Sequence, residues 1–150
     1  CIRDSASAGA MAVGASQQKV ALMRRFGEAV GMAFQIQDDI LDYTRTAQTG
    51  KPANNDLREG KITLPLLAVL DKAPAERRTE LLGRLACCHD DEESVEYLQR
   101  TVENEGGLTF AAEVMRSYIA RAVEMLSEYE ASDYRTALAN LCAYIAERDR

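Results

Sequence analysis

The chain has 150 residues, enough for one domain of ordinary size. Hydrophobic residues make up 47% and charged residues 28%, which is typical of a globular protein and excludes a disordered one. The net charge of −6 argues against nucleic acid as a partner, and no apolar run approaches the roughly 20 residues that a membrane helix needs.

Only three prolines and nine glycines interrupt a chain rich in Ala, Leu, Glu and Arg, which predicts an all-α fold. Residues 1–14 resemble the end of a helix whose start is missing, and Ser16 is the expected N-cap of a long helix from about Gln17 to Thr44. Apolar residues recur along this helix at steps of three and four: Leu22, Phe26, Ala29, Ala33, Ile36, Ile40 and Tyr43. This stripe predicts a helix at the centre of a bundle.

The end of this helix carries three aspartates, Asp38, Asp39 and Asp42, on one narrow arc, with Gln35 one turn earlier. Like charges at this spacing repel each other by about 0.2–0.5 kcal/mol per pair, and here they crowd the negative end of the helix dipole. Arg45 is the basic residue placed to relieve them locally. Because carboxylates are hard oxygen ligands, we predict a magnesium or calcium site that lines a cavity.

The aspartates are followed by an expected 18-residue loop at 45–62, and loops of this length are usually functional or disordered. The loop carries Lys51, Asp56, Arg58 and Lys61. Taken alone, these residues would be an ordinary solvated loop. Beside an acidic patch they suggest a diphosphate ligand, since magnesium bridges carboxylate to phosphate and lysine neutralises the remaining charge.

Five more helices are expected at about 64–70, 75–87, 91–105 and 108–130 and from residue 133 onward. Thr63 is the expected N-cap of the first and Asp133 that of the last. The acidic run 89–94 is interpreted as the cap and first turn of the third helix, where acids suit the helix dipole. The apolar stripe expected on the last helix is Tyr134, Leu138, Leu141 and Ile145.

The four cysteines form no recognisable framework. Cys87 and Cys88 are adjacent, Cys1 and Cys142 are far apart, and there is no CxxC spacing. With a single histidine in the chain, a zinc site is disfavoured. We therefore expect buried, reduced thiols in a cytoplasmic protein.

Several of these residues belong to one extended motif. It reads Phe34-Gln35, then Asp38-Asp39-x-x-Asp42, then Gly50-Lys51-Pro52, and then Asp56-Leu57-Arg58-Glu59-Gly60-Lys61-x-Thr63-Leu64-Pro65. The string closely resembles the second aspartate-rich motif, FQxxDDxxD, of the trans-isoprenyl (polyprenyl) diphosphate synthases, together with the loop after it. The loop is most similar to that of bacterial octaprenyl and heptaprenyl diphosphate synthases. The ending Leu138-x-x-Leu141-x-x-Tyr144-Ile145-x-x-Arg148 is also similar to the family's C-terminus.

The resemblance implies the helical bundle of the isoprenoid synthases. Residues 1–150 would form the C-terminal portion of a single synthase domain, with its N-terminal portion and first aspartate-rich motif absent. The implied enzyme is a prenyltransferase that condenses an allylic prenyl diphosphate head-to-tail with isopentenyl diphosphate, giving a medium- or long-chain all-trans polyprenyl diphosphate. We expect the intact enzyme to be a homodimer and the fragment itself to be inactive.

The resemblance also implies roles for single residues. The expected Mg²⁺ ligands, direct or through metal-bound water, are Asp38, Asp39, Asp42 and Asp56, with Asp38 the foremost direct ligand. The expected contacts to the substrate diphosphate are Lys51 and Lys61. Gln35 would lie near the reacting end and complete the catalytic set with the three aspartates of the helix. Phe34 would pack against the cavity wall or simply belong to the core.

Two other functions stay open. The chain could be a non-catalytic helical subunit or scaffold of a heteromeric prenyl synthase, or it could belong to a terpene cyclase of similar architecture. The loop at 45–62 with its two lysines, which we call the lysine loop, fits a cyclase poorly. The joint presence of these lysines and of the three helix aspartates favours an enzyme over a scaffold. A second DDxxD motif upstream would support the enzyme.

Overall fold

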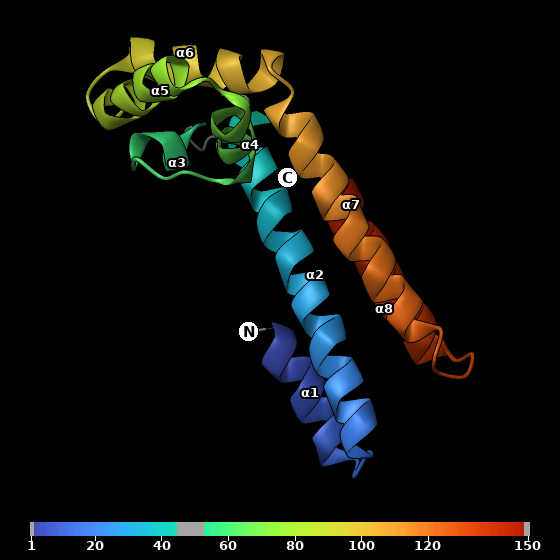
Figure 1. Ribbon diagram of the computed structural model, residues 1–150. Coiled ribbons are helices and arrows are strands. Elements are labelled where there is room, and N and C mark those ends of the chain that lie inside the picture. Colours follow the sequence, from blue (N-terminus) through green and yellow to red (C-terminus); the bar gives the residue numbers. More distant parts are fainter. Residues whose placement is uncertain (1, 45–52, 149–150) are drawn as a thin grey trace. The chain divides into compact units, whose positions relative to one another are not determined.

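The computed structural model describes residues 2–44 and 53–148, and every regular element within these ranges is an α-helix (Figure 1). The elements are α1 (Ile2–Ala12), α2 (Gln17–Thr44), α3 (Asn55–Arg58), α4 (Leu64–Lys72), α5 (Ala75–Cys87), α6 (Glu92–Asn104), α7 (Gly107–Leu126) and α8 (Asp133–Glu147). The predicted all-α fold is confirmed. The chain divides into two compact units, one of residues up to 37 and from 114 onward, the other of residues 38–113.

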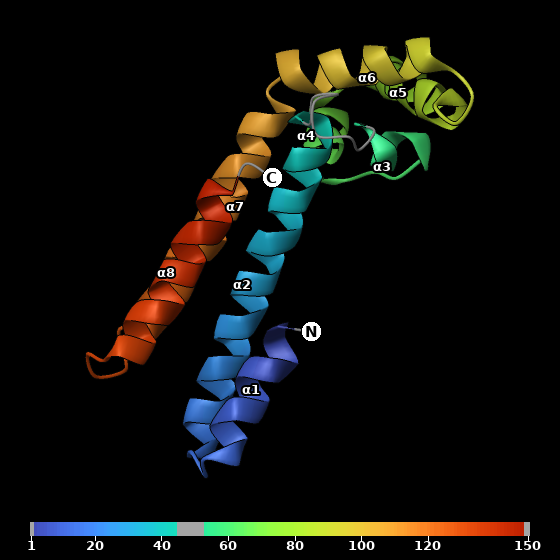
Figure 2. The same ribbon diagram turned by 180° about the vertical axis from the view of Figure 1, so that it is seen from behind.

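In the first unit, α1 lies along the early part of α2, as both views show (Figures 1 and 2). The two helices come so close that a Cβ added to Gly27 would stand 2.8 Å from the Cα of Arg3, so only glycine fits there. Ser16 is the predicted N-cap, because its Oγ accepts a hydrogen bond from the Lys19 N–H at 3.3 Å. Five members of the predicted stripe lie here and are at most 5% exposed: Leu22, Phe26, Ala29, Ala33 and Ile36. Of the last two members, Tyr43 is buried and Ile40 is only partly buried.

The first unit also contains α8 and most of α7, which run side by side in both views (Figures 1 and 2). α7 ends at Leu126, four residues earlier than predicted. The predicted cap of α8 is wrong by one residue, because Ser132 Oγ accepts the Arg135 N–H at 3.2 Å while Asp133 is already helical.

The predicted apolar stripe of α8 is also wrong in part. Tyr134 is 85% and Leu141 46% exposed, whereas Cys142 and Ile145 are buried. Ile145, a member of the predicted stripe, lies between the exposed Tyr134 and the buried Cys142 around the helix, so the packed side of α8 is shifted from the predicted stripe toward Cys142. Hydrophobicity alone does not reveal which part of a broad apolar surface finds a neighbour.

In the second unit, α3 to α6 surround one apolar core. Its members are Tyr43, Leu57, Leu66, Val69, Leu70, Leu81, Leu85, Cys88, Val95, Leu98 and Val102. α4 runs two residues further than expected, to Lys72, because Pro74 rather than any earlier residue ends the helical stretch. Thr63 precedes α4 as predicted, although its side chain forms no capping hydrogen bond.

The predicted 18-residue loop is partly helical. Residues 45–52, with Arg45 and Lys51, lie outside the described residues, and α3 occupies four of the positions that follow. α3 forms because Leu57 is drawn into the core and is fully buried. The helix is entered through Asn54, which has a φ of 61° and donates its backbone N–H to the Asp42 carbonyl at 2.9 Å.

α6 starts as its acidic run predicts. The Asp91 carboxylate accepts the Glu93 N–H at 3.2 Å and the Ser94 hydroxyl at 2.5 Å, so the run 89–94 is a helix cap. The cysteine expectation needs one correction: Cys88 and Cys142 are buried free thiols, but Cys87 is exposed because it faces away from the core at the end of α5. No helix among the described residues is long and apolar enough to cross a membrane.

Candidate functional site

Four of the predicted carboxylates lie in the second unit and act on one another; we call Asp38, Asp39, Asp42 and Asp56 the acidic cluster. Asp42 is only 5% exposed, and the other three are half-buried. Burial raises the pKa of Asp39, and the negative charges of Asp56, Asp38 and Asp42 raise it further, against the opposing effect of the Leu64 backbone N–H. The charges of α2 and of the following segment therefore lie close enough to act on Asp39.

The acidic cluster faces the beginnings of two helices. Asp42 Oδ2 accepts the Asp56 N–H at 2.9 Å in the first turn of α3, and Asp39 Oδ2 accepts the N–H of Leu64, the first residue of α4, at 3.5 Å. Helix N-termini carry a partial positive charge, so both contacts stabilise the carboxylates. The sequence predicted that Arg45, which lies outside the described residues, offsets the repulsion among the aspartates. It did not predict the contribution of the two helix N-termini.

Lys61 lies beside the acidic cluster. Its Nζ is 3.2 Å from Asp56 Oδ1 and 2.5 Å from Glu59 Oε2, and these contacts, that with Glu59 first, raise the pKa of the ammonium group. Both bonds are exposed, and exposed ion pairs are weak, so Lys61 can exchange these partners for a stronger anion. Arg58 of the same segment turns instead to Glu92 of α6, at 2.7 Å, and serves the packing of α3.

Two buried hydroxyl groups, those of Tyr43 and Thr63, lie near the acidic cluster, and the sequence predicted no role for them in the site. Neither Tyr43 Oη nor Thr63 Oγ1 forms a hydrogen bond of standard geometry with another described residue. Burial raises the pKa of Tyr43, the neighbouring hydroxyl of Thr63 lowers it in part, and the charges of Asp42, Asp56 and Asp39 raise it further. Thr63 is itself a residue of the motif, where it is expected only as a helix cap, and Tyr43 directly follows the motif residue Asp42, where the apolar stripe predicts only a core residue.

Gln35 and Phe34 belong to the first unit. Gln35 is exposed and lines, with Phe34, Met32 and Gly31 among others, a groove of about 570 Å³. The Phe34 ring lies 4.5 Å from the guanidinium of Arg148. One helical turn on, Gln37 Nε2 donates to the Arg148 carbonyl at 2.6 Å. Phe34 is thus both a groove residue and a packing residue, as the two interpretations of the sequence allowed.

The donors of the acidic cluster fit a hard divalent cation. All are carboxylate oxygens, and a cation would relieve the charge repulsion that raises the pKa of Asp39. Within residues 2–44 and 53–148, no three His, Cys, Asp or Glu side chains are grouped closely enough to enclose a metal. Magnesium does not need such a cage, because it keeps several waters and is commonly bound by one or two carboxylates together with substrate phosphates.

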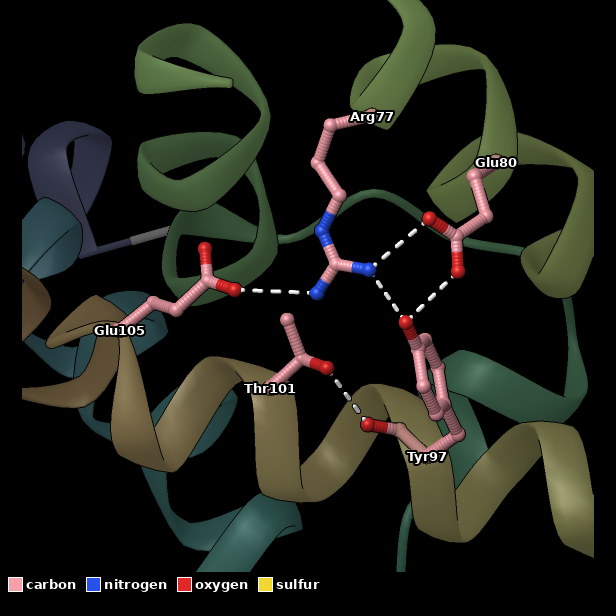
Figure 3. A network of polar contacts seen from close by, with 5 residues as sticks. All are labelled: Arg77, Glu80, Tyr97, Thr101 and Glu105. Atoms are coloured by element: carbon pink, nitrogen blue, oxygen red, sulfur yellow. Dashed lines mark hydrogen bonds and ion pairs between the residues drawn. The ribbon is translucent and has the colours of Figure 1, made fainter. Parts of the chain in front are cut away.

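A second polar network lies between α5 and α6 (Figure 3). Arg77 contacts Glu80 at 2.9 Å, Glu105 at 3.1 Å and the hydroxyl of Tyr97, which also donates to Glu80. The guanidinium of Arg84 lies 4.8 Å from the centre of the Tyr97 ring. The positive charge of Arg77 is neutralised by Glu80 and Glu105 of the same network. We therefore interpret this network as a structural contact that holds α5 against α6.

Comparison with known proteins gives consistent matches. Residues 1–104 match the family described as polyprenyl synthetase. The chain is 34% identical over 149 residues to a short chain isoprenyl diphosphate synthase of Methanothermobacter thermautotrophicus, covering 99% of the chain and 45% of the relative. The same figures hold for heptaprenyl diphosphate synthase component 2 of Geobacillus stearothermophilus.

A solved structure resembles the chain equally well. It is a polyprenyl synthase from Caulobacter crescentus complexed with calcium and isoprenyl diphosphate, with a TM-score of 0.86 and 32% identity over 99% of this chain and 46% of that one. The chain thus spans less than half the length of each of these relatives.

Proposed function

Since the chain belongs to the polyprenyl synthetase family, we propose that it carries the metal- and diphosphate-binding part of a trans-prenyltransferase active site. The observation that carries the proposal is the acidic cluster with Lys61 bound at its edge. We further propose that residues 1–150 correspond to the C-terminal portion of one synthase domain. Their coverage of about 45% of the relatives supports this assignment.

The proposed reaction joins an allylic prenyl diphosphate head-to-tail to isopentenyl diphosphate. Bound Mg²⁺ supplies charge stabilisation to the departing diphosphate. Asp38, Asp39 and Asp56 hold the metal, directly or through water, and Lys61 leaves its exposed acidic partners for the diphosphate. Lys51 adds a second ammonium group, and Gln35 lies at the reacting end of the substrate. Asp42 is also a predicted ligand, but we propose for it a positioning role instead.

The finer features of the proposal have separate support. The Caulobacter relative was solved with calcium and isoprenyl diphosphate, which supports a divalent cation and prenyl diphosphate substrates. The lysine loop and the heptaprenyl relative support a medium or long all-trans product, although another relative is named a short chain synthase. The free thiols of Cys87, Cys88 and Cys142 support a cytoplasmic location. A homodimer is proposed for the intact enzyme from family resemblance alone.

A second candidate is a subunit of a heteromeric prenyl synthase. The Geobacillus relative is named component 2 of its enzyme, so at least one related protein works as part of a larger assembly. In that case the chain is inactive alone and turnover appears only with a partner protein.

The test is a radiolabelled condensation assay on the full translation product that contains this chain, with and without EDTA. We expect Mg²⁺-dependent incorporation of isopentenyl diphosphate, and a loss of at least about 100-fold in turnover for Asp38→Asn, because one ligand carboxylate is removed. The exposed Asp90→Asn is the matched control.

Unchanged turnover in Asp38→Asn would remove this residue from the site. Activity insensitive to EDTA would contradict the metal role. Turnover by the 150 residues alone would overturn the proposal that they form only part of a site.

A further inference from the structure

We infer that Asp42 is a positioning residue rather than a metal ligand: its carboxylate holds Asp56 and Lys61 in place through the first turn of α3. The inference rests on the proposed function, because it assigns a role within that same site. It starts from the burial of Asp42, which is 5% exposed and the least accessible member of the acidic cluster. A magnesium ligand has to reach water and substrate phosphates, and a carboxylate this deeply buried is poorly placed for that.

The contacts of Asp42 are already directed at the protein. Its Oδ2 accepts the Asp56 N–H at 2.9 Å, and its backbone carbonyl accepts the Asn54 N–H at 2.9 Å. Asn54 is the residue with positive φ that leads into α3, and its own side chain forms no cap. Asp42 therefore replaces the missing cap from a distant part of the chain, fastening α3 at two adjacent points.

The hydrogen bonds from Asp42 to α3 also fix the positions of Asp56 and Lys61, the two groups proposed to bind metal and substrate. The Asp56 carbonyl accepts the Lys61 N–H at 2.8 Å, and Asp56 Oδ1 accepts from Lys61 Nζ at 3.2 Å. A displacement of the Asp56 backbone would consequently move one proposed metal ligand and one proposed diphosphate contact together. Asp42, the last aspartate of DDxxD, thereby links the end of α2 to Asp56 and Lys61.

Gln99 of α6 further stabilises the segment that leads into α3. It accepts from Asn54 Nδ2 at 2.7 Å and donates to the Tyr43 carbonyl at 3.2 Å. The entry to α3 is thus held against the end of α2 by hydrogen bonds on both sides of Asp42. The arrangement needs an acceptor oxygen at Asp42, and it does not need a negative charge.

The experiment separates the acceptor oxygen of Asp42 from its negative charge. Asp42→Asn keeps an acceptor oxygen and removes the charge, whereas Asp42→Ala removes both, and Asp38→Asn is the control at a proposed ligand. Two quantities are measured: the hydrogen-exchange rate of the Asp56 amide in metal-free protein, and the affinity for Mg²⁺ in the presence of inorganic diphosphate, by calorimetry.

For Asp42→Asn we expect amide exchange within about threefold of wild type and a loss of Mg²⁺ affinity below about fivefold, the effect of one more distant charge. For Asp42→Ala we expect exchange at least about tenfold faster. For Asp38→Asn we expect unchanged exchange and a loss of affinity above about twentyfold.

The inference is overturned if Asp42→Asn weakens Mg²⁺ binding as much as Asp38→Asn does, or if Asp42→Ala folds and leaves the exchange of Asp56 unchanged. Should Asp42→Ala not fold, the isosteric Asp42→Asn still decides by its affinity and exchange. If wild-type protein binds no Mg²⁺ with diphosphate, the proposed function fails, while the exchange measurements still test the hydrogen bond from Asp42 to the Asp56 amide.

Discussion

Asp39 combines partial burial with three like charges around it. A carboxyl group whose pKa is higher in the folded than in the unfolded protein makes folding less favourable once it ionises. The stability associated with its protonated form is present below the unfolded pKa of about 3.9 and is lost as the pH rises through the folded value.

We therefore expect Asp39→Asn to raise the melting temperature at pH 7 by about 3 °C, with solvent screening part of the repulsion because the side chain is half-exposed. Calorimetric scans from pH 3 to 8 should show this gain vanish below about pH 4. Asp90→Asn removes the same charge from an exposed position and should show no such gain. An Asp39→Asn protein less stable than wild type at pH 7 would contradict the repulsion.

The site residues differ in how far sequence alone could place them. The gathering of Asp38, Asp39 and Asp42 follows from helical periodicity, and Asp56 and Lys61 could be added from the motif. The bond from Asp42 to the Asp56 amide could not be foreseen, since it depends on a four-residue helix that forms only because Leu57 is buried. The position of the Tyr43 hydroxyl could not be foreseen either, because an apolar stripe does not show where a polar group at the tip of a side chain lies, and Thr63 is predicted only as a helix cap.

At the scale of elements, the contact between α5 and α6 combines an apolar seam with the polar network of Figure 3. The apolar part should dominate its stability. Leu81 is fully buried, and Leu81→Ala is expected to lower the free energy of unfolding by about 3 kcal/mol through lost burial and a cavity.

The network around Arg77 should contribute less, because its partners Glu80 and Glu105 are half-exposed. Arg77→Met keeps the aliphatic stem and should cost less than about 1 kcal/mol. Urea unfolding followed by circular dichroism measures both variants. A larger loss for Arg77→Met than for Leu81→Ala would reverse this ranking.

Helices whose ends carry a cap or a proline could be placed within two residues from the sequence. The Ser16 cap, the Asp91 cap and Pro74 each act locally, so the pattern of side chains contains the signal. The early end of α7 and the shifted packed side of α8 are different, because both depend on what each segment packs against. Tertiary contacts, rather than propensity, decide such cases.

At the scale of the whole molecule, α8 presents an apolar surface to solvent. Tyr134 is 85%, Tyr144 62% and Leu141 46% exposed, and helical spacing places the three within one arc of the helix. The packed residues Ile145 and Cys142 adjoin this arc, since Ile145 lies one helical turn from Leu141 on the same side of α8, so the exposed arc continues the packed apolar surface into solvent. Contiguous exposed apolar surface commonly mediates association.

We therefore expect the 150-residue chain to self-associate at micromolar concentrations, with a weight-average sedimentation coefficient that rises with concentration. Leu141→Glu places a charge in the middle of the apolar arc and should shift the protein toward monomer, because burying that charge in an interface is costly. Ala143→Glu is the control, since it adds the same charge to the same helix at an exposed position on the side away from the arc. If wild-type protein sediments as a clean monomer, the arc does not mediate association; if both variants dissociate equally, net charge rather than this face controls it.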